Sequence, residues 1–341
     1  MPNKLVGQVS NLRAAFQAAL PGFRHPPLTL TLLLLLLLTS CTPRKTKTIA
    51  VVPKGTSHMF WVSVQAGALA AGQKLNVEVL WNGPAQETEY DRQIQIVDSM
   101  VARHVDGLAV APAERKALVG PIERAAQAGI PVTVFDSGID TTNYMCFLAT
   151  DNYDAGKLGA RELARLLGGH GQVALLMHAP GSASTMDRER GFEDAVKSEF
   201  PNLAIVARQY GMSDRSKAMA AAENILTAHP DLNGVFASSE PSSVGTALAL
   251  KSRGLSSKVK FVAFDSTDSM IEDLKGGTID VMVVQDPFQM GYQAVKTLVD
   301  KLNGATPPKR VDLPAHVIRR EDLDKPEVQE LLKPDVKKYL K

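Results

Sequence analysis

The sequence predicts an α/β protein built from two doubly wound lobes, and three observations lead to this fold class. From Thr46 onward, short apolar runs alternate with longer amphipathic segments, which indicates parallel sheets covered by helices. The short runs are apolar almost throughout, as in strands that are buried on both faces. Nine such runs occur, which is too many for one sheet of ordinary size, so two lobes are expected.

Each element is predicted from its own pattern, because apolar runs bounded by turn residues indicate strands and apolar residues at helical spacing indicate helices. The predicted strands are Thr48–Val52, Val77–Trp81, Gly107–Ala111, Pro131–Phe135, Val173–Met177, Leu203–Arg208, Gly234–Ala237, Lys260–Phe264 and Val281–Gln285. The predicted helices are Phe60–Lys74, Glu87–Arg103, Ala117–Ala128, Ala155–Leu167, Ser184–Glu199, Asp214–His229 and Ser242–Arg253.

Several predicted strands end in polar residues, at the edge of the sheet where open α/β folds bind their ligands. Ordinary loops with helix caps are one explanation, and it suits Ser242 and Thr267. It suits Asp136 and Asp265 less well, because each directly follows an apolar strand. These two carboxylates are better explained as hydrogen-bond acceptors for a ligand.

The N-terminus has the pattern of a lipoprotein export signal. Residues 1–40 contain no acidic residue, three basic ones and the apolar run Leu28–Leu38, and Cys41 follows directly. The apolar run is shorter than the roughly 20 residues that span a bilayer, and a small-residue site ends it. A signal anchor that stays attached, with Cys41 an ordinary residue, is the alternative.

This pattern predicts a signal peptide over 1–40 and a lipidated tether over 41–47, with diacylglycerol on the Cys41 thiol. This diacylglycerol, together with an amide-linked acyl chain on Cys41, would make the anchoring stable, since one chain binds membranes only marginally. The protein is therefore expected in the periplasm or at the cell surface, held to the membrane through Cys41.

Charge and cysteine content exclude two classes of protein. The chain has 38 basic and 36 acidic residues, and without the three basic residues of the signal 35 basic residues remain. With this balance the chain lacks the excess of basic residues that is typical of proteins that bind nucleic acid. Cys41 and Cys146 are the only cysteines, so a disulfide framework is excluded, and Cys146 is expected to be buried and inert.

Seven motifs occur in an order that is typical of one family. They are Thr48–Val52 with Phe60–Ala68, Pro131–Asp136, Ala149–Asn152, Arg188–Phe192, Ala228–Asp231, Val262–Asp265 and Gln285–Gly291. In this order they resemble the periplasmic sugar-binding proteins of the ribose-binding type, which have the type I periplasmic binding protein fold. Each motif is modest alone, and their order along the chain makes the resemblance specific.

The resemblance implies two lobes joined by three hinge crossings, with a sugar in the cleft between them. The crossings are expected near Thr150-Asp151, Gln285-Asp286 and His316. The implied N-terminal lobe comprises residues 48–150 and 286–316. The implied C-terminal lobe, with the tail, comprises residues 151–285 and 317–341.

The resemblance also assigns roles in the cleft. Phe60 and Trp61 match the two aromatic residues that pack on the sugar, although a helix packing face would also explain them. The remaining matches to family ligand-binding residues are Asp136, Arg188, Asp265 and Gln285. Carboxylates and guanidinium groups form charge-assisted hydrogen bonds, which suit a polyol that must exchange water for equally good partners.

The chain departs from the family pattern at other ligand positions. Ser137 replaces an arginine that usually follows the first aspartate, and an aromatic residue expected near Ser213 is missing. Ser239, followed by Glu240, replaces an asparagine. These smaller side chains indicate a ligand that is larger than ribose or differently decorated.

Lys54 and His58 also differ from the family, which tends to have small or amide residues in this loop. Together with Arg188 they favour an acidic or phosphorylated sugar. The alternative is that the carboxylates at the strand ends neutralise them.

The predicted function is that of a monomeric binding protein without metal or cofactor, which delivers a sugar-like solute to the permease of an ABC transporter. A receptor that signals to a membrane histidine kinase or chemoreceptor would have the same soluble chain. A DNA-binding repressor of the same fold would need a helix-turn-helix where the signal lies. No motif of a nucleotide-binding, metal-dependent or nucleophilic enzyme occurs.

Overall fold

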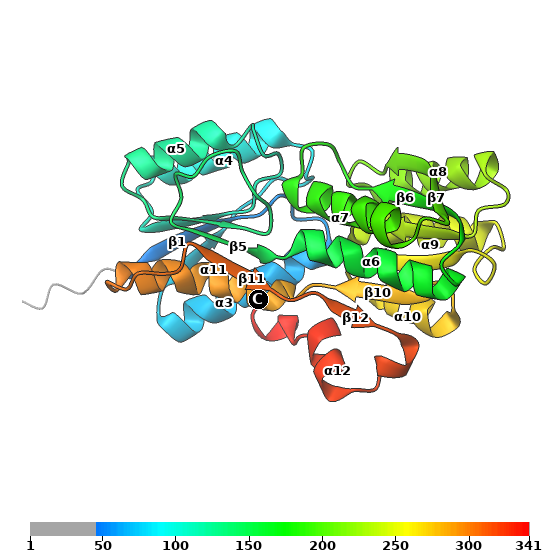
Figure 1. Cartoon of the computed structure of the whole chain (residues 1–341). Coiled ribbons are helices and arrows are strands. Elements are labelled where there is room, and N and C mark those ends of the chain that lie inside the picture. The colour runs from blue at the N-terminus through cyan, green and yellow to red at the C-terminus, as the bar shows by residue number, and fades with distance from the viewer. Residues whose placement is uncertain (1–45, 341) are drawn as a thin grey trace, which may run out of the picture. The chain divides into compact units, whose positions relative to one another are not determined.

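The computed structural model describes residues 46–340, so the expected signal peptide and the expected lipidation site, Cys41, lie outside the described residues. The first of two six-stranded sheets has the order β11-β5-β4-β3-β1-β2, and every neighbouring pair in it is parallel (Figure 1). Its strands are β1 (Thr48–Val52), β2 (Glu78–Trp81), β3 (Gly107–Val110), β4 (Val132–Phe135), β5 (Cys146–Thr150) and β11 (Arg310–Leu313).

The second sheet has the order β12-β10-β9-β8-β6-β7, and only β12 is antiparallel to its neighbour. Its strands are β6 (Gly171–Met177), β7 (Leu203–Tyr210), β8 (Gly234–Ala237), β9 (Lys260–Phe264), β10 (Val281–Val284) and β12 (His316–Ile318). The chain therefore passes between the sheets three times: after β5, after β10 and after β11.

Helices cover both faces of each sheet. The first five are α3 (Met59–Leu75), α4 (Tyr90–Ala102), α5 (Val119–Gln127), α6 (Asn152–Leu167) and α7 (Ala183–Glu199). The later ones are α8 (Arg215–Ala228), α9 (Glu240–Ser252), α10 (Asp268–Gly276), α11 (Pro287–Leu302) and α12 (Pro326–Leu332), with the short 3₁₀ turns η1 (Arg320–Asp322) and η2 (Val336–Lys338).

Strand β1 shows why the first sheet has helices on both faces. Successive side chains of a strand point to opposite faces. Ile49 and Val51 join the apolar core under α3 and α11, whereas Ala50 and Val52 join the core under α4 and α5. We call this sheet with α3, α4, α5 and α11 the first lobe.

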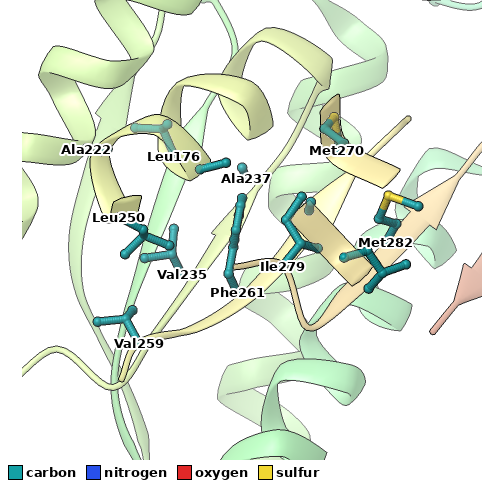
Figure 2. Packing of buried hydrophobic residues seen from close by; sticks show 14 of the residues in the cluster. Leu176, Ala222, Val235, Ala237, Leu250, Val259, Phe261, Met270, Ile279 and Met282 are labelled. Carbon is teal, nitrogen blue, oxygen red and sulfur yellow. The ribbon is translucent and has the colours of Figure 1, made fainter. Parts of the chain in front are cut away.

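Strand β6 divides in the same way in the second sheet. Val173 and Leu175 pack beneath α6 and α7, and Ala174 and Leu176 pack beneath α8, α9 and α10. Figure 2 shows the second of these cores. We call this sheet with α6 to α10 the second lobe. The predicted fold class, with two doubly wound lobes and three crossings, is confirmed.

Three strands occur beyond the nine that the sequence predicts. β11 and β12 are edge strands, and most of the β11 side chains face solvent at least in part. These two strands lack the apolar run that marks a buried strand, because their side chains are largely exposed or only half-buried. β5 coincides with the apolar stretch around Cys146, which is buried and unpaired.

The helix expected over Glu87–Arg103 begins three residues late, at Tyr90. Residues 86–89 form a turn in which the Glu89 side chain accepts a hydrogen bond from the Gln86 amide, 2.9 Å apart. Glu87 is thus in a loop rather than on a helix.

The C-terminal tail contacts both lobes. Val328 of α12 belongs to a core of the second lobe, while η2 packs against α3 of the first lobe. Within residues 46–340, no helix is both long enough and apolar enough to cross a membrane.

Candidate functional site

A cavity with an empty volume of about 330 Å³ lies where the carboxyl ends of strands from both lobes meet. The residues that line it are Lys54, His58, Phe60, Trp61, Glu87, Asp136, His178, Ser184, Thr185, Arg188, Ser239, Glu240, Pro241, Asp265 and Gln285.

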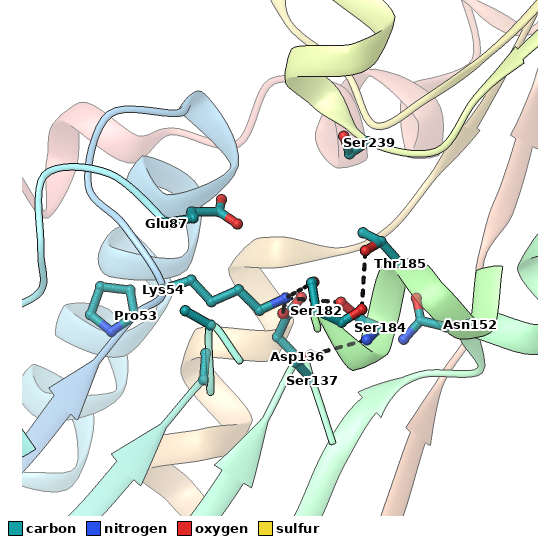
Figure 3. Close-up of polar contacts among 12 residues, drawn as sticks. Pro53, Lys54, Glu87, Asp136, Ser137, Asn152, Ser182, Ser184, Thr185 and Ser239 are labelled. Carbon is teal, nitrogen blue, oxygen red and sulfur yellow. Dashed lines mark hydrogen bonds and ion pairs between the residues drawn. The ribbon is translucent and has the colours of Figure 1, made fainter. Parts of the chain in front are cut away.

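Asp136 lies directly after β4 and is held in a left-handed backbone conformation, with φ of 61°. Its carboxylate forms a 2.7 Å ion pair with the Lys54 ammonium group, and both side chains are almost completely buried. Lys54 also donates to the hydroxyls of Ser182 and Ser184 in the second lobe, at 3.2 and 2.9 Å (Figure 3). The lysine therefore joins the lobes as well as neutralising the aspartate.

Asp265 has the equivalent position after β9 in the second lobe, with φ of 68°. Its two oxygens accept hydrogen bonds from the Gln285 side chain (2.8 Å) and from the Glu240 backbone amide (3.1 Å). Burial raises the pKa of this carboxyl to about 6, although the charge of Arg188 opposes the rise.

Arg188 projects from α7 and is fully buried. Its Nη1 atom donates to the Ser238 carbonyl at 2.7 Å, and its Nη2 atom donates to Asn152 Oδ1 at 2.6 Å. The guanidinium carbon lies 3.7 Å from the centroid of the Phe264 ring. These contacts fix the guanidinium group in one orientation, which a binding site requires.

Phe60 and Trp61 occupy the first turn of α3 and meet edge to face, with ring centroids 4.9 Å apart. Trp61 is only 2 % exposed and belongs to a core of the first lobe. Both rings also line the cavity. Packing in the core and lining of the cavity are therefore compatible for these two residues, and their packing on a sugar stays a prediction.

Glu87 joins three side chains. Its Oε1 atom accepts from Trp61 Nε1 at 2.8 Å and lies 3.1 Å from His58 Nδ1. Its Oε2 atom lies 2.9 Å from Nε2 of His178, in the second lobe. Burial works to raise the pKa of Glu87, but the charges and hydrogen bonds of the two histidines hold it well below its usual value.

Ser239 and Glu240 lie at the start of α9. The Ser239 hydroxyl contacts His178 Nδ1 at 2.9 Å, and the Glu240 carboxylate pairs with Arg215 and accepts from the Phe60 amide. Ser137, which was expected among the ligand-binding residues, is fully buried behind the cavity and accepts a hydrogen bond from the Ser184 amide instead.

Sequence reasoning missed Glu87 and His178. Glu87 was included in a helical pattern and was not expected in a loop. His178 directly follows β6, so the argument that selected Asp136 and Asp265 could also have selected it. Ser184, Thr185 and Pro241 line the cavity as well, and their residue types give no signal in the sequence.

The comparisons with known proteins agree on one family. Residues 49–306 match the model of the periplasmic binding protein domain. The chain is 31 % identical over 261 residues to the ribose import binding protein of Escherichia coli, covering 75 % of this chain and 85 % of that one. It is 29 % identical over 279 residues to a D-ribose/D-allose-binding protein of Pseudomonas aeruginosa, covering 80 % of this chain and 86 % of that one.

Solved structures lead to the same family. A carbohydrate transporter solute-binding protein from Agrobacterium radiobacter, in complex with D-arabinose, is 34 % identical with a TM-score of 0.83, covering 85 % of this chain and all of that one. An ABC transporter solute-binding protein from Agrobacterium vitis with bound D-fucose is 34 % identical with a TM-score of 0.82, covering 84 % of this chain and all of that one. The chain belongs to the periplasmic sugar-binding proteins of the ribose-binding type, a non-enzymatic family that provides the solute-binding proteins of ABC transporters.

Proposed function

We propose that the protein binds an uncharged monosaccharide in the cavity between its lobes and delivers it to the permease of an ABC transporter. The observation that carries this proposal is the meeting of Asp136 and Asp265, one from each lobe, at a single cavity with an aromatic wall. Carboxylates accept hydrogen bonds from sugar hydroxyls, and aromatic rings cover the apolar face of a sugar ring. Names of relatives mention ribose, allose, arabinose and fucose.

Charge pairing favours an uncharged sugar over an acidic or phosphorylated one. Lys54 is paired with Asp136, and the charge of Arg188 is balanced by the nearby Asp265. A ligand anion would have to compete with these carboxylates. A polyol can instead insert its hydroxyls among groups whose charges already balance.

The three passages of the chain between the sheets serve, in our proposal, as the hinge on which the lobes close. On this basis the first lobe comprises residues 48–150 and 286–316, and the second lobe with the tail comprises residues 151–285 and 317–341. At the third crossing the strand boundary lies slightly earlier than this limit, since β11 of the first sheet ends at Leu313 and His316 already pairs with Val284 at the edge of the second sheet.

We also propose that Cys41 carries the lipid that keeps the protein near its permease. A Cys41→Ser variant of the full chain should remain unlipidated and leave the detergent phase on phase separation. A variant that still partitions into detergent would contradict the lipid anchor.

Thermal-shift screening tests the proposed ligand class. Residues 46–341 form one compact unit that holds all four apolar cores, so this fragment is suitable. A ligand stabilises a protein by RT ln(1 + [L]/Kd), and millimolar D-ribose, D-allose, D-arabinose or D-fucose should raise the melting temperature. A rise with sugar acids or sugar phosphates alone would refute an uncharged ligand.

A further inference from the structure

A buried contact between Glu87 and His178 links the two lobes at one end of the cavity. Glu87 comes from the loop before α4 in the first lobe, and His178 follows β6 in the second lobe. Their side-chain atoms Oε2 and Nε2 are 2.9 Å apart, and the residues are 9 % and 3 % exposed.

Each partner is held in place by its own lobe. On the first lobe, Trp61 Nε1 and His58 Nδ1 both contact Oε1 of Glu87, which leaves Oε2 directed at the second lobe. On the second lobe, the His178 ring contacts the Ser239 hydroxyl, and the His178 amide donates to Glu189 at 3.0 Å. The contact thus joins two groups that are oriented before they meet.

We propose that Glu87 and His178 form an inter-lobe latch, a positioning pair that is made when the lobes close and that raises ligand affinity by stabilising the closed form. The inference rests on the proposed sugar-binding function, because it concerns the closure of the same cavity. A ligand gains apparent affinity when the conformation that binds it is more populated. Opening would return both groups to water and remove the hydrogen bond.

The electrostatic surroundings of Glu87 also make the stability of the first lobe depend on pH. Besides Glu87, the groups that face His58 are Glu240 from α9 and Arg215 from α8, and Arg188 of α7 lies near Glu87. Burial lowers the pKa of His58, but the hydrogen bond and charge of Glu87 outweigh it and raise the pKa above its usual 6.5. The contact between His58 and Glu87 lies within the first lobe, so this pKa acts on folding. A histidine with a raised pKa stabilises below its unfolded value, and this contribution to folding stability is complete in mild acid and lost as the pH rises through the raised pKa.

The test compares Glu87→Gln with wild type in the 46–341 protein. Glutamine keeps the shape of the side chain and an acceptor oxygen while it removes the charge. Glu89→Gln is the matched control, since Glu89 is exposed in the same turn and glutamine preserves its acceptor for the Gln86 amide. Calorimetric titration with D-ribose, D-allose, D-arabinose and D-fucose at a series of pH values gives the readout.

We expect Glu87→Gln to bind roughly tenfold to a hundredfold more weakly than wild type, because a charge-assisted hydrogen bond is lost. His178→Gln should give the same loss without adding to it in the double variant. Wild-type affinity in Glu87→Gln would overturn the latch and leave the proposed function standing.

If wild type binds none of these sugars, the proposed function fails instead. Solution scattering then tests the latch independently of a sugar. The radius of gyration of wild type should be smaller than that of Glu87→Gln. Equal radii for both proteins would overturn the latch.

Discussion

Asp136 and Asp265 are two of six non-glycine residues with positive φ in the described part of the chain. This conformation is strained for most residues, and asparagine and aspartate tolerate it best. Strained residues cluster at functional sites, where the surrounding structure fixes them. In each lobe, this left-handed conformation at the end of a strand directs an aspartate carboxylate toward the shared cavity.

Asp265→Asn should remove most sugar affinity while the protein stays folded. Asparagine tolerates φ of 68°, but its amide nitrogen donates and cannot accept. One of the two donors that Asp265 now satisfies, Gln285 or the Glu240 backbone amide, then loses its acceptor, and fewer acceptor sites remain for a sugar hydroxyl. Loss of one side of a buried charged contact costs about 2–5 kcal/mol, which titration calorimetry with the sugar found by screening would detect. Asp268→Asn is the control, because that side chain is 91 % exposed. Equal affinities in both variants would remove Asp265 from the site.

Glu189 lies behind the cavity and is buried with an unusual pKa. Its Oε1 atom accepts from the His178 amide and the Ser238 hydroxyl, and its Oε2 atom has no partner among the described residues. Burial raises its pKa from 4.5 to about 7, against the pull of these hydrogen bonds and of Arg188.

This raised pKa predicts how stability changes with pH. Between pH 4.5 and about 7 the folded protein keeps a proton on Glu189 that the unfolded chain has released. The stabilising contribution is therefore complete below pH 4.5 and is lost as the pH rises through about 7. In urea denaturation, the free energy of unfolding of wild type should fall by up to about 3 kcal/mol over this pH range because of Glu189. Glu189→Gln should not show this decrease. An equal decrease in the free energy of unfolding in Glu189→Gln and wild type would refute the raised pKa of Glu189. Glu193→Gln, on the same helix, controls for the loss of charge.

At the level of elements, glycines let two pairs of helices pack unusually closely, one pair in each lobe. A Cβ atom on Gly67 of α3 would lie 1.9 Å from the Phe288 carbonyl oxygen of α11. One on Gly156 of α6 would lie 1.9 Å from the carbonyl oxygen of Arg188 itself. Close packing of α6 on α7 thus sets the position of the cleft arginine.

Gly156→Ala should therefore affect both stability and binding. The added methyl group must push α7 away, and overpacking of this kind costs about 1–3 kcal/mol. Arg188 should move with the helix and sugar affinity should fall. Gly276→Ala at the end of α10 is a matched control, because nothing lies within 4 Å of its new methyl group. Thermal melts with and without sugar measure both effects, and unchanged melting of Gly156→Ala would contradict the close contact.

The sequence predicted the buried elements better than the edges. The bounds of β1, β8 and β9 coincide with the predictions, because burial on both faces is visible in the local pattern. Asp136 and Asp265 were identifiable because they directly follow such strands. The pairing of β12 with β10 depends on a partner 34 residues away, and such pairing leaves little local trace.

Contacts between the lobes were the hardest to predict. Neutralisation of Lys54 by a carboxylate such as Asp136 was one of the alternatives that the sequence left open. Nothing in the sequence indicated that Lys54 would also contact Ser184 of the second lobe, since distant segments of the chain provide the two residues. The network around Glu87 depends on a helix that begins later than its apolar spacing indicates. Such contacts arise only when both lobes have formed and the cleft brings them together.

At the scale of the whole molecule, the tail adds a link beside the three crossings. Helix α12 packs on the second lobe, and the Tyr339 ring then meets Phe288 at the start of α11 in the first lobe, with centroids 5.8 Å apart. Phe288 directly follows the second crossing, so the tail braces the protein next to its hinge.

Tyr339→Ala tests whether this brace stabilises the whole molecule. An aromatic pair contributes about 0.5–1.5 kcal/mol beyond the area it buries, so the free energy of unfolding should fall by at least this amount in urea denaturation. Tyr210→Ala provides the control, because Tyr210 is 41 % exposed and forms no aromatic pair among the described residues. Because Tyr339 lies outside the cavity, its loss should lower the stability of the protein and leave unchanged which sugar it binds. Wild-type stability in Tyr339→Ala would show that the tail rests on the first lobe without bracing it.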